Sequence, residues 1–292
     1  MQKVSETNNQ SRDKALIAGT IIIVSLLSLL PMGRLLLEVI MPAKGTAVEA
    51  IGRVFSSSAT WTATWHSLYV GVFGTVFAVI LGTGVALLVS LTDIRGRSVF
   101  IFLYVTPLLI APQVTALAWL QLFGPASPFL KMIGMAPPLG SRNPLYSSTG
   151  IILLLGVQYG PLVFLIVRAG LRKLPRELIE AALSSGAKKL IVLRTIIVPL
   201  MAPSIIGATA LTFVSCVGNF GIPAFLGIPA NYLVLPTLIY QRLSGGGPAV
   251  LTDVATLSIL IGVIAIVGIV AQEYVSRWRD YRIASTSLPA SP

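Results

Sequence analysis

The sequence is poor in charge: Asp, Glu, Lys and Arg make up 11% of its 292 residues, whereas a soluble domain carries about 25%. It also holds only one histidine and one cysteine. The single cysteine, Cys216, excludes an internal disulfide framework. Because it falls in an apolar run, we interpret it as a small core residue. This composition argues against a soluble globular domain.

Long apolar runs take the place of the missing charge. Hydrophobic residues make up 55% of the chain, and mean hydropathy is +0.87. A helix needs about 20 apolar residues to cross the hydrocarbon core of a bilayer. Six segments of about that length occur, at residues 15–37, 65–91, 99–123, 149–167, 201–226 and 254–273. The sequence therefore predicts an all-α, polytopic membrane protein with six transmembrane helices.

The segments around these runs predict the domain organisation. We expect a membrane domain over residues 15–275, with a polar, disordered tail at 1–14 and a second tail at 276–292. The first span is interpreted as a membrane anchor and not a signal peptide, because its apolar stretch is too long and no small-x-small cleavage site follows. Loops are expected at residues 38–64, 124–148 and 227–253.

Glycines and prolines predict local features of the spans. Pro107 and Pro112 predict a kink in the third span. Four glycines of the second span are expected to permit close helix contact: Gly71, Gly74, Gly82 and Gly84.

The basic residues lie in short segments between spans. Lys and Arg number 21 against 10 Asp and Glu, and we interpret this excess as a topology signal and not as a nucleic-acid surface. Placing the N-terminus inside leaves six basic residues outside: Arg34, Lys44, Arg53, Lys131, Arg142 and Arg242. The other basic residues then face the cytoplasm, and both termini lie inside.

Several kinds of site are missing from the sequence. A Walker A loop, G-x-x-x-x-G-K-[ST], does not occur, since Gly186-Ala187-Lys188 lacks the rest of the pattern. No spacing predicts a metal-ligand cluster or a catalytic residue. His66 opens the second span and is interpreted as an interfacial residue. The chain is thus expected not to be an enzyme and to have no cofactor of its own.

Residues 172–199 form a polar interruption between two apolar segments. Pro175 suits the first turn of a helix, and Glu177 follows where a helix dipole favours negative charge. Gly186 is placed to end this helix in a tight turn. A second helical run is expected from Ala187 to Val198, closed by Pro199. We interpret the stretch as a helix–turn–helix outside the bilayer.

This interruption resembles the EAA loop of ABC importer permeases. The family pattern is EAA, three residues, Gly, nine residues and Ile-x-Leu-Pro. The sequence matches it with Glu180, Ala181, Ala182, Gly186, Ile196 and Pro199, and Val198 replaces the leucine. The resemblance covers roughly residues 60–275 and implies the type I ABC importer permease fold.

The resemblance implies a coupling role for this loop. It would sit in a groove of a separate ATPase subunit that uses ATP and Mg²⁺, and two permease chains, identical or sister, would be needed because one loop serves one ATPase. The alternative is an amphipathic helix that rests on lipid headgroups, favoured by Lys188 and Lys189.

Polar residues inside the spans are candidates for the substrate pathway. They are Gln113, Gln158 and Asn219. Gly221 and Pro223 either break a helix where a cavity opens, or Pro223 simply ends the fifth span.

Two further stretches, residues 219–227 and 235–241, resemble permeases of the ferric iron, polyamine, thiamine and aminoethylphosphonate importers. This resemblance favours iron(III) as cargo and implies a periplasmic or lipoprotein binding protein and a location in the bacterial inner membrane. Two rivals from other classes are a secondary transporter driven by an ion gradient, for which no intramembrane acid is found, and a non-transporting scaffold or sensor.

Overall fold

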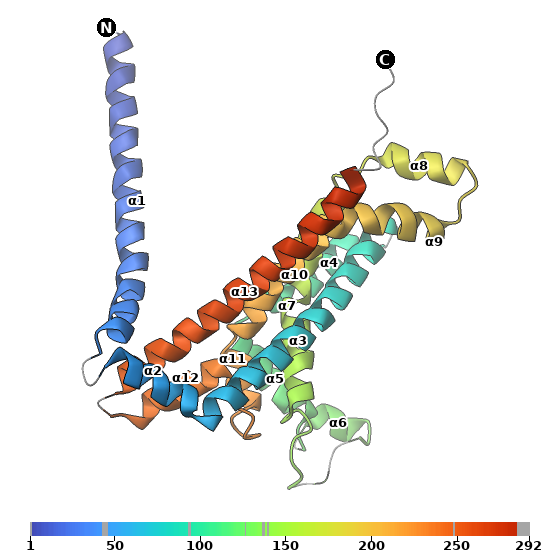
Figure 1. Cartoon of the computed structure of the whole chain (residues 1–292). Coiled ribbons are helices and arrows are strands. Elements are labelled where there is room, and N and C mark those ends of the chain that lie inside the picture. Colours follow the sequence, from blue (N-terminus) through green and yellow to red (C-terminus); the bar gives the residue numbers. More distant parts are fainter. Residues whose placement is uncertain are drawn as a thin grey trace. The chain divides into compact units, whose positions relative to one another are not determined.

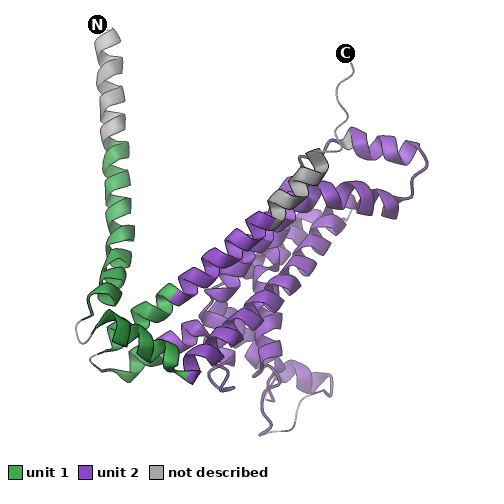
Figure 2. Ribbon diagram, viewed as in Figure 1, with its two compact units in different colours: residues 1–57, 241–259 green, residues 58–240, 260–292 purple. Residues whose placement is uncertain are grey.

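The structure is a computed structural model that describes residues 2–42, 46–92, 95–125, 127–135, 138, 140–247 and 249–284. For residues 2–15, Arg176 and 275–284 it describes the backbone alone. All regular elements in these ranges are helical (Figure 1), which confirms the predicted all-α class. The chain divides into two compact units, residues 1–57 with 241–259 and residues 58–240 with 260–292 (Figure 2).

The first unit holds helices α1 (Gln2–Ile40) and α2 (Ala47–Ser56) with parts of α12 (Leu235–Gly245) and α13 (Val250–Ala284). The helix that carries the first span reaches back to Gln2, so the tail predicted to be disordered is helical. The expected loop at 38–64 is also wrong, because it contains α2. A capping box starts α2: the Thr46 hydroxyl accepts from the Glu49 N–H at 3.3 Å, and the Thr46 N–H donates to the Glu49 carboxylate at 3.2 Å.

Charged side chains tie the helices of this unit together. Asp253 of α13 lies 3.9 Å from Arg53 of α2 and 3.9 Å from Arg242 of α12. Glu38 of α1 pairs with Arg34 at 3.0 Å and accepts from the Thr252 hydroxyl at 3.3 Å. These contacts join segments from both ends of the sequence.

The second unit is built on α3 (Ser58–Leu91), α7 (Ser148–Leu171) and α10 (Val198–Val217). Small residues let α3 and α7 approach closely: a Cβ at Gly82 would meet the Gly160 carbonyl oxygen at 2.4 Å. Gly71 and Gly74 likewise face side chains of α10 and α7. The prediction of close contact is wrong for Gly84, which is exposed, and a Cβ added there would meet no atom within 4 Å.

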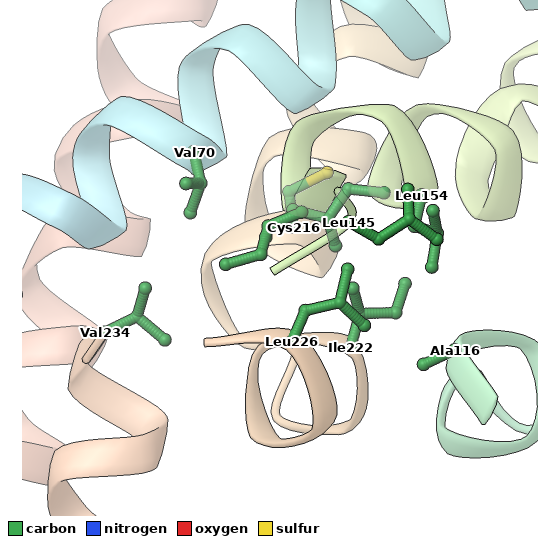
Figure 3. Packing of buried hydrophobic residues seen from close by; sticks show 10 residues of the cluster. Val70, Ala116, Leu145, Leu154, Cys216, Ile222, Leu226 and Val234 are labelled. Carbon is green, nitrogen blue, oxygen red and sulfur yellow. The ribbon is translucent and has the colours of Figure 1, made fainter. Parts of the chain in front are cut away.

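Two apolar clusters fill this unit. One joins α3, α7, α10 and shorter helices through residues that Figure 3 shows facing one another: Val70, Ala116, Leu145, Leu154, Cys216, Ile222, Leu226 and Val234. Cys216 is buried there, as its apolar surroundings predict. The second cluster lies farther along the same helices and includes Phe164, Val167, Val192 and Ile197.

The expected third span is two helices and not one kinked helix. α4 (Arg97–Leu109) and the segment Pro112–Met132, which holds α5 (Pro112–Phe123) and α6 (Pro128–Met132), meet at 107°. A bend at Pro107 and Pro112 was predicted, but its size was not. The described residues thus contain five helices long and apolar enough to span a membrane, or six if the bent pair counts as one span.

Helix ends in the second half also differ from expectation. Pro199 does not close a helix, because α9 (Lys189–Val192), the π-helix η1 (Leu193–Ile197) and α10 run on as one candidate span, Lys189–Val217. That span ends at Val217, and Pro223 lies inside the separate helix α11 (Gly221–Leu226). The expected loops at 124–148 and 227–253 contain α6 and α12.

Candidate functional site

Helix α8 (Arg176–Ser184) is a short helix bounded by two turn residues. Pro175 is its N-cap, and Glu177 lies in its first turn. At its end the Gly186 N–H donates to the Leu183 carbonyl at 3.0 Å and the Ala187 N–H to the Ala182 carbonyl at 3.1 Å. Gly186 has φ +82, so these bonds form a Schellman motif with glycine at its left-handed position. The predicted turn at Gly186 is confirmed.

The two faces of α8 have different surroundings. Ile179 and Ala182 are half-buried and pack against the second apolar cluster, as do Leu174 and Ala187 on either side of the helix. Glu180 and Ala181 are exposed, and so is Leu178, which keeps 50% of its surface accessible. The inner face thus fixes the helix, and the outer face offers a carboxylate, a small residue and an apolar side chain.

The second half of the motif forms the entry to α10. Ile196 is half-buried against the second apolar cluster, and Pro199 lies in the first turn of α10. Proline has no N–H to donate. The backbone widens just before it: the Val198 N–H donates to the Leu193 carbonyl, five residues earlier. The π-turn lets the helix run on through Pro199.

Gln158, a predicted pathway residue, is buried, with 2% of its surface exposed. Its Nε2 donates to the carbonyls of Pro107 at 2.8 Å and of Ile110 at 3.1 Å. These carbonyls lie at the break between α4 and α5. The Pro107 carbonyl also accepts from the Ile110 N–H at 3.2 Å, but no backbone N–H in the described part of the chain donates to the Ile110 carbonyl. Gln158 therefore supplies a donor that the broken helix lacks at Ile110.

Asn219 is also buried, with 5% exposed, and it bridges a second break. Its Nδ2 donates to the Tyr159 hydroxyl at 2.9 Å, and its Oδ1 accepts from the Ile222 N–H at 3.0 Å. Asn219 thus caps the start of α11. Gln158 and Tyr159 are neighbours on α7, and each forms a hydrogen bond at one of the two helix breaks.

Gln113 is the exposed member of the three predicted pathway residues. It lies beside α11, because a Cβ on Gly221 would meet the Gln113 nitrogen at 2.9 Å and its Oε1 at 3.0 Å. The structure thus brings Gln113, Gln158 and Asn219 to one place, where the two helix breaks meet. Sequence reasoning missed Tyr159, whose signal was its position next to Gln158.

His66, predicted to be an interfacial residue, has two structural partners. Its ring stacks on Tyr232 with centroids 3.7 Å apart, and its Nδ1 lies 2.9 Å from the Leu233 carbonyl oxygen. Burial raises the pKa of Tyr232 to about 12, so this phenol stays neutral at physiological pH. The pair joins α3 to the segment before α12.

Known proteins resemble this chain over most of its length. Residues 74–281 match the family described as "Binding-protein-dependent transport system inner membrane component". The probable ABC transporter permease y4fN of Sinorhizobium fredii is 24% identical over 61% of this chain and 32% of its own length, so the chain spans about a third of that relative. The putrescine transport system permease PotI of Escherichia coli is 28% identical over 82% of this chain and 81% of PotI.

A solved structure supports the fold. The bacterial alginate ABC transporter, in complex with an alginate pentasaccharide-bound periplasmic protein, contains a chain that superposes with a TM-score of 0.77 at 19% identity, covering 97% of this chain and 99% of that chain. This likeness shows the type I ABC importer permease architecture expected from the sequence. Because the family match covers more than half of the sequence, the chain belongs to the inner membrane components of binding-protein-dependent transport systems, the permeases of ABC importers.

Proposed function

We propose that this chain is the permease subunit of an ATP-driven importer and that α8 couples it to a separate ATPase. The observation that carries the proposal is the division of α8 into an anchored and an open face. Ile179 and Ala182 pack into the second apolar cluster, so a force on the outer face moves the packed helices with it. Ala181 allows a second surface to approach closely, and Glu180 offers a charge for a basic partner.

The outer face of this segment also favours a protein partner over solvent. Leu178, on α8 itself, is apolar and keeps 50% of its surface exposed. The Lys and Arg distribution favours a cytoplasmic position for α8, with both termini inside. On this proposal ATP and Mg²⁺ are bound by the ATPase, and a second permease chain supplies a second coupling helix.

The cargo path is proposed to follow the helix breaks. Gln113 is exposed beside them, whereas Gln158 and Asn219 act as internal supports. A cleft of about 560 Å³ lies near the N-terminal end of α7, opposite to the end that leads into α8, and Gln121, Arg142 and Tyr146 contribute to its lining. We propose that cargo from an external binding protein enters at this end and leaves on the α8 side by alternating access.

Iron(III) stays our prediction for the cargo, with polyamine, thiamine and aminoethylphosphonate as alternatives. The names of the relatives point to different cargoes, such as putrescine for PotI, so family membership does not select one. Labelled iron(III) and putrescine, offered to a strain that lacks this gene and to the complemented strain, separate these options. Restored uptake of putrescine alone would overturn the iron prediction.

The coupling role is tested with Glu180→Lys and Gly186→Pro. Proline holds φ near −65° and so is incompatible with the turn at Gly186, while Glu180→Lys reverses a charge on the outer face. Both are expected to abolish uptake of the cargo found by complementation and to leave membrane insertion unchanged. Gly52→Lys, at an exposed position of α2 where an added Cβ meets nothing within 4 Å, is the control that keeps uptake.

The same strain separates the rival class. A secondary transporter would lose uptake when the ion gradient is collapsed at constant ATP. Our proposal predicts that uptake survives this treatment and stops when ATP is depleted. Full uptake by the Glu180→Lys variant would contradict the coupling role of α8.

A further inference from the structure

Three arginines gather beneath α8, at the ends of two helices. Arg97 is the first residue of α4, and Arg168 and Arg172 lie in the last turn and at the C-cap of α7. Arg168 lies within electrostatic reach of both of the others. None of the three forms an ion pair with a carboxylate in the described part of the chain, where the ion pairs lie at Glu38 and Asp253. Like charges held together repel, and no carboxylate in the described part of the chain offsets this repulsion.

Two of these guanidinium groups also lack an acceptor. The Nε atoms of Arg97 and Arg168 are shielded from solvent, and neither has a hydrogen-bond partner in the described part of the protein. Buried donors without acceptors are rare in folded proteins and need an explanation. Arg168 is held in place over the Phe164 ring, 5.6 Å from its centroid. The charge is therefore positioned and is not a freely moving surface group.

A cavity of about 360 Å³ opens at this cluster. Arg97 and Arg172 line it together with Ser90 and with Ile179 from the inner face of α8. A water molecule occupies about 30 Å³ in the liquid, so the cavity has room for a group of several heavy atoms. The N-terminus of α4 adds backbone donors, since its N-cap, Gly96, provides no side-chain cap.

We propose that this cavity binds a phosphate-bearing anion. Guanidinium groups pair with phosphate through two parallel hydrogen bonds, and the free N–H groups at the start of α4 favour an anion at the same place. The ligand neutralises the arginine cluster and supplies the acceptor that the Nε of Arg97, in the cavity wall, lacks. Arg168 lies outside the lining and adds its charge from nearby. The inference rests on Arg97, Arg168, Arg172 and the cavity, and does not depend on the coupling role of α8.

The cavity lies against the inner face of α8, so a ligand bound there affects this helix. Ile179 forms part of its wall, so an anion bound there supports the inner face of α8. Phosphate of this kind comes from two sources: the headgroup of an anionic lipid, because the arginines lie at the ends of membrane-spanning helices, or a free phosphate compound in solution.

The test uses the purified full-length chain and its Arg97→Gln/Arg172→Gln variant. Thermal unfolding is followed by tryptophan fluorescence in detergent with sodium phosphate or sodium chloride at equal ionic strength. It is repeated in vesicles of phosphatidylcholine with or without phosphatidylglycerol. Arg194→Gln removes one exposed charge outside the cavity and serves as the control. The Arg97→Lys/Arg172→Lys variant keeps the charge and tests whether substitution at these two positions by itself prevents folding.

We expect an anion to raise the melting temperature of the wild-type and Arg194→Gln proteins, with an apparent affinity at least about tenfold weaker in the double glutamine variant, because two charge-assisted pairs are lost. The lysine variant retains part of the shift. A shift with phosphatidylglycerol alone assigns the site to a lipid headgroup, and one with inorganic phosphate assigns it to a soluble ligand. Equal shifts in the wild-type and double glutamine proteins, or none with either probe, overturn the proposal.

Discussion

At the scale of single residues, buried amides hold the two helix breaks. Gln158 donates from one Nε2 to two carbonyls, those of Pro107 and Ile110. The Pro107 carbonyl also accepts from the Ile110 N–H at 3.2 Å, whereas no backbone N–H in the described part of the chain donates to the Ile110 carbonyl. The position of α5 relative to α4 therefore depends on a side chain from a third helix.

Gln158→Met keeps the length of this side chain and removes its donors. We expect the free energy of unfolding to fall by about 0.5–1.5 kcal/mol, because two part-buried hydrogen bonds from Gln158 are lost. Thermal unfolding in detergent measures the change, with Gln113→Met as the exposed counterpart that leaves stability within about 0.5 kcal/mol. Equal melting temperatures for the Gln158→Met and wild-type proteins would contradict the supporting role of Gln158.

Tyr159 and Asn219 form the second support, and two variants separate its parts. Tyr159→Phe removes the hydroxyl and leaves the Asn219 bond to Ile222 in place, so we expect a loss of about 0.5–1.5 kcal/mol. Asn219→Ala removes both bonds and should cost more. A double-mutant cycle measures the coupling of the pair, and strictly additive effects would show that the 2.9 Å contact does not contribute.

At the scale of elements, α3 and α7 depend on small residues where they touch. The matched pair is Gly82→Ala and Gly84→Ala, two residues apart on α3. The Cβ of the first would lie 2.4 Å from the Gly160 oxygen, and such overpacking costs about 1–3 kcal/mol. The second meets open space and gains up to about 1 kcal/mol of helix propensity. Melting temperatures should move in opposite directions, and a shared direction would contradict the packing.

The spans could be predicted from hydropathy because their cause is local. The same is true of the turn at Gly186, which glycine marks by itself. Pro107 and Pro112 mark the bend at Ile110 locally. Its support by Gln158 has a distant origin, 48 residues away in the sequence, and no local pattern reports such a partner. Pro199 was read as a helix end because a π-turn before a proline leaves little trace in composition.

Residues of the candidate site could likewise be predicted where their cause is local, and not where it is distant. Glu180, Ala181 and Gly186 stand in one continuous motif, so the positions of the first two on α8 and of Gly186 in the turn after it followed from spacing. Gln158 and Asn219 were predicted as pathway residues because they are polar within apolar runs. That rule does not distinguish a side chain that faces a cavity from one that caps a broken helix, and their hydrogen bonds favour the second role.

At the scale of the whole molecule, the helix α7 connects the cleft at its beginning to α8 at its end. The α7 helix begins beside the cleft formed with residues 141–146 and α11, supports both helix breaks near its middle, and leads into α8 at its end. Movement of α8 is thereby connected through one rigid element to the place where α5 and α11 meet. A transporter that opens on alternate sides needs such a connection.

The most direct test of this account is cross-linking from α8 in membranes of the native host. Cys216 is buried, so its replacement by alanine gives a background for a single cysteine at Ala181, with Thr149→Cys at the other end of α7 as the matched control. A maleimide that carries a photoreactive benzophenone is attached to the cysteine and irradiated, so that it inserts into C–H bonds of any neighbouring protein, and mass spectrometry identifies the adducts. We predict a Walker A-containing ATPase joined to position 181 and absent from position 149. Two results would contradict the claim that α8 is the coupling surface. One is the absence of any protein adduct at position 181, and the other is the same ATPase at both positions.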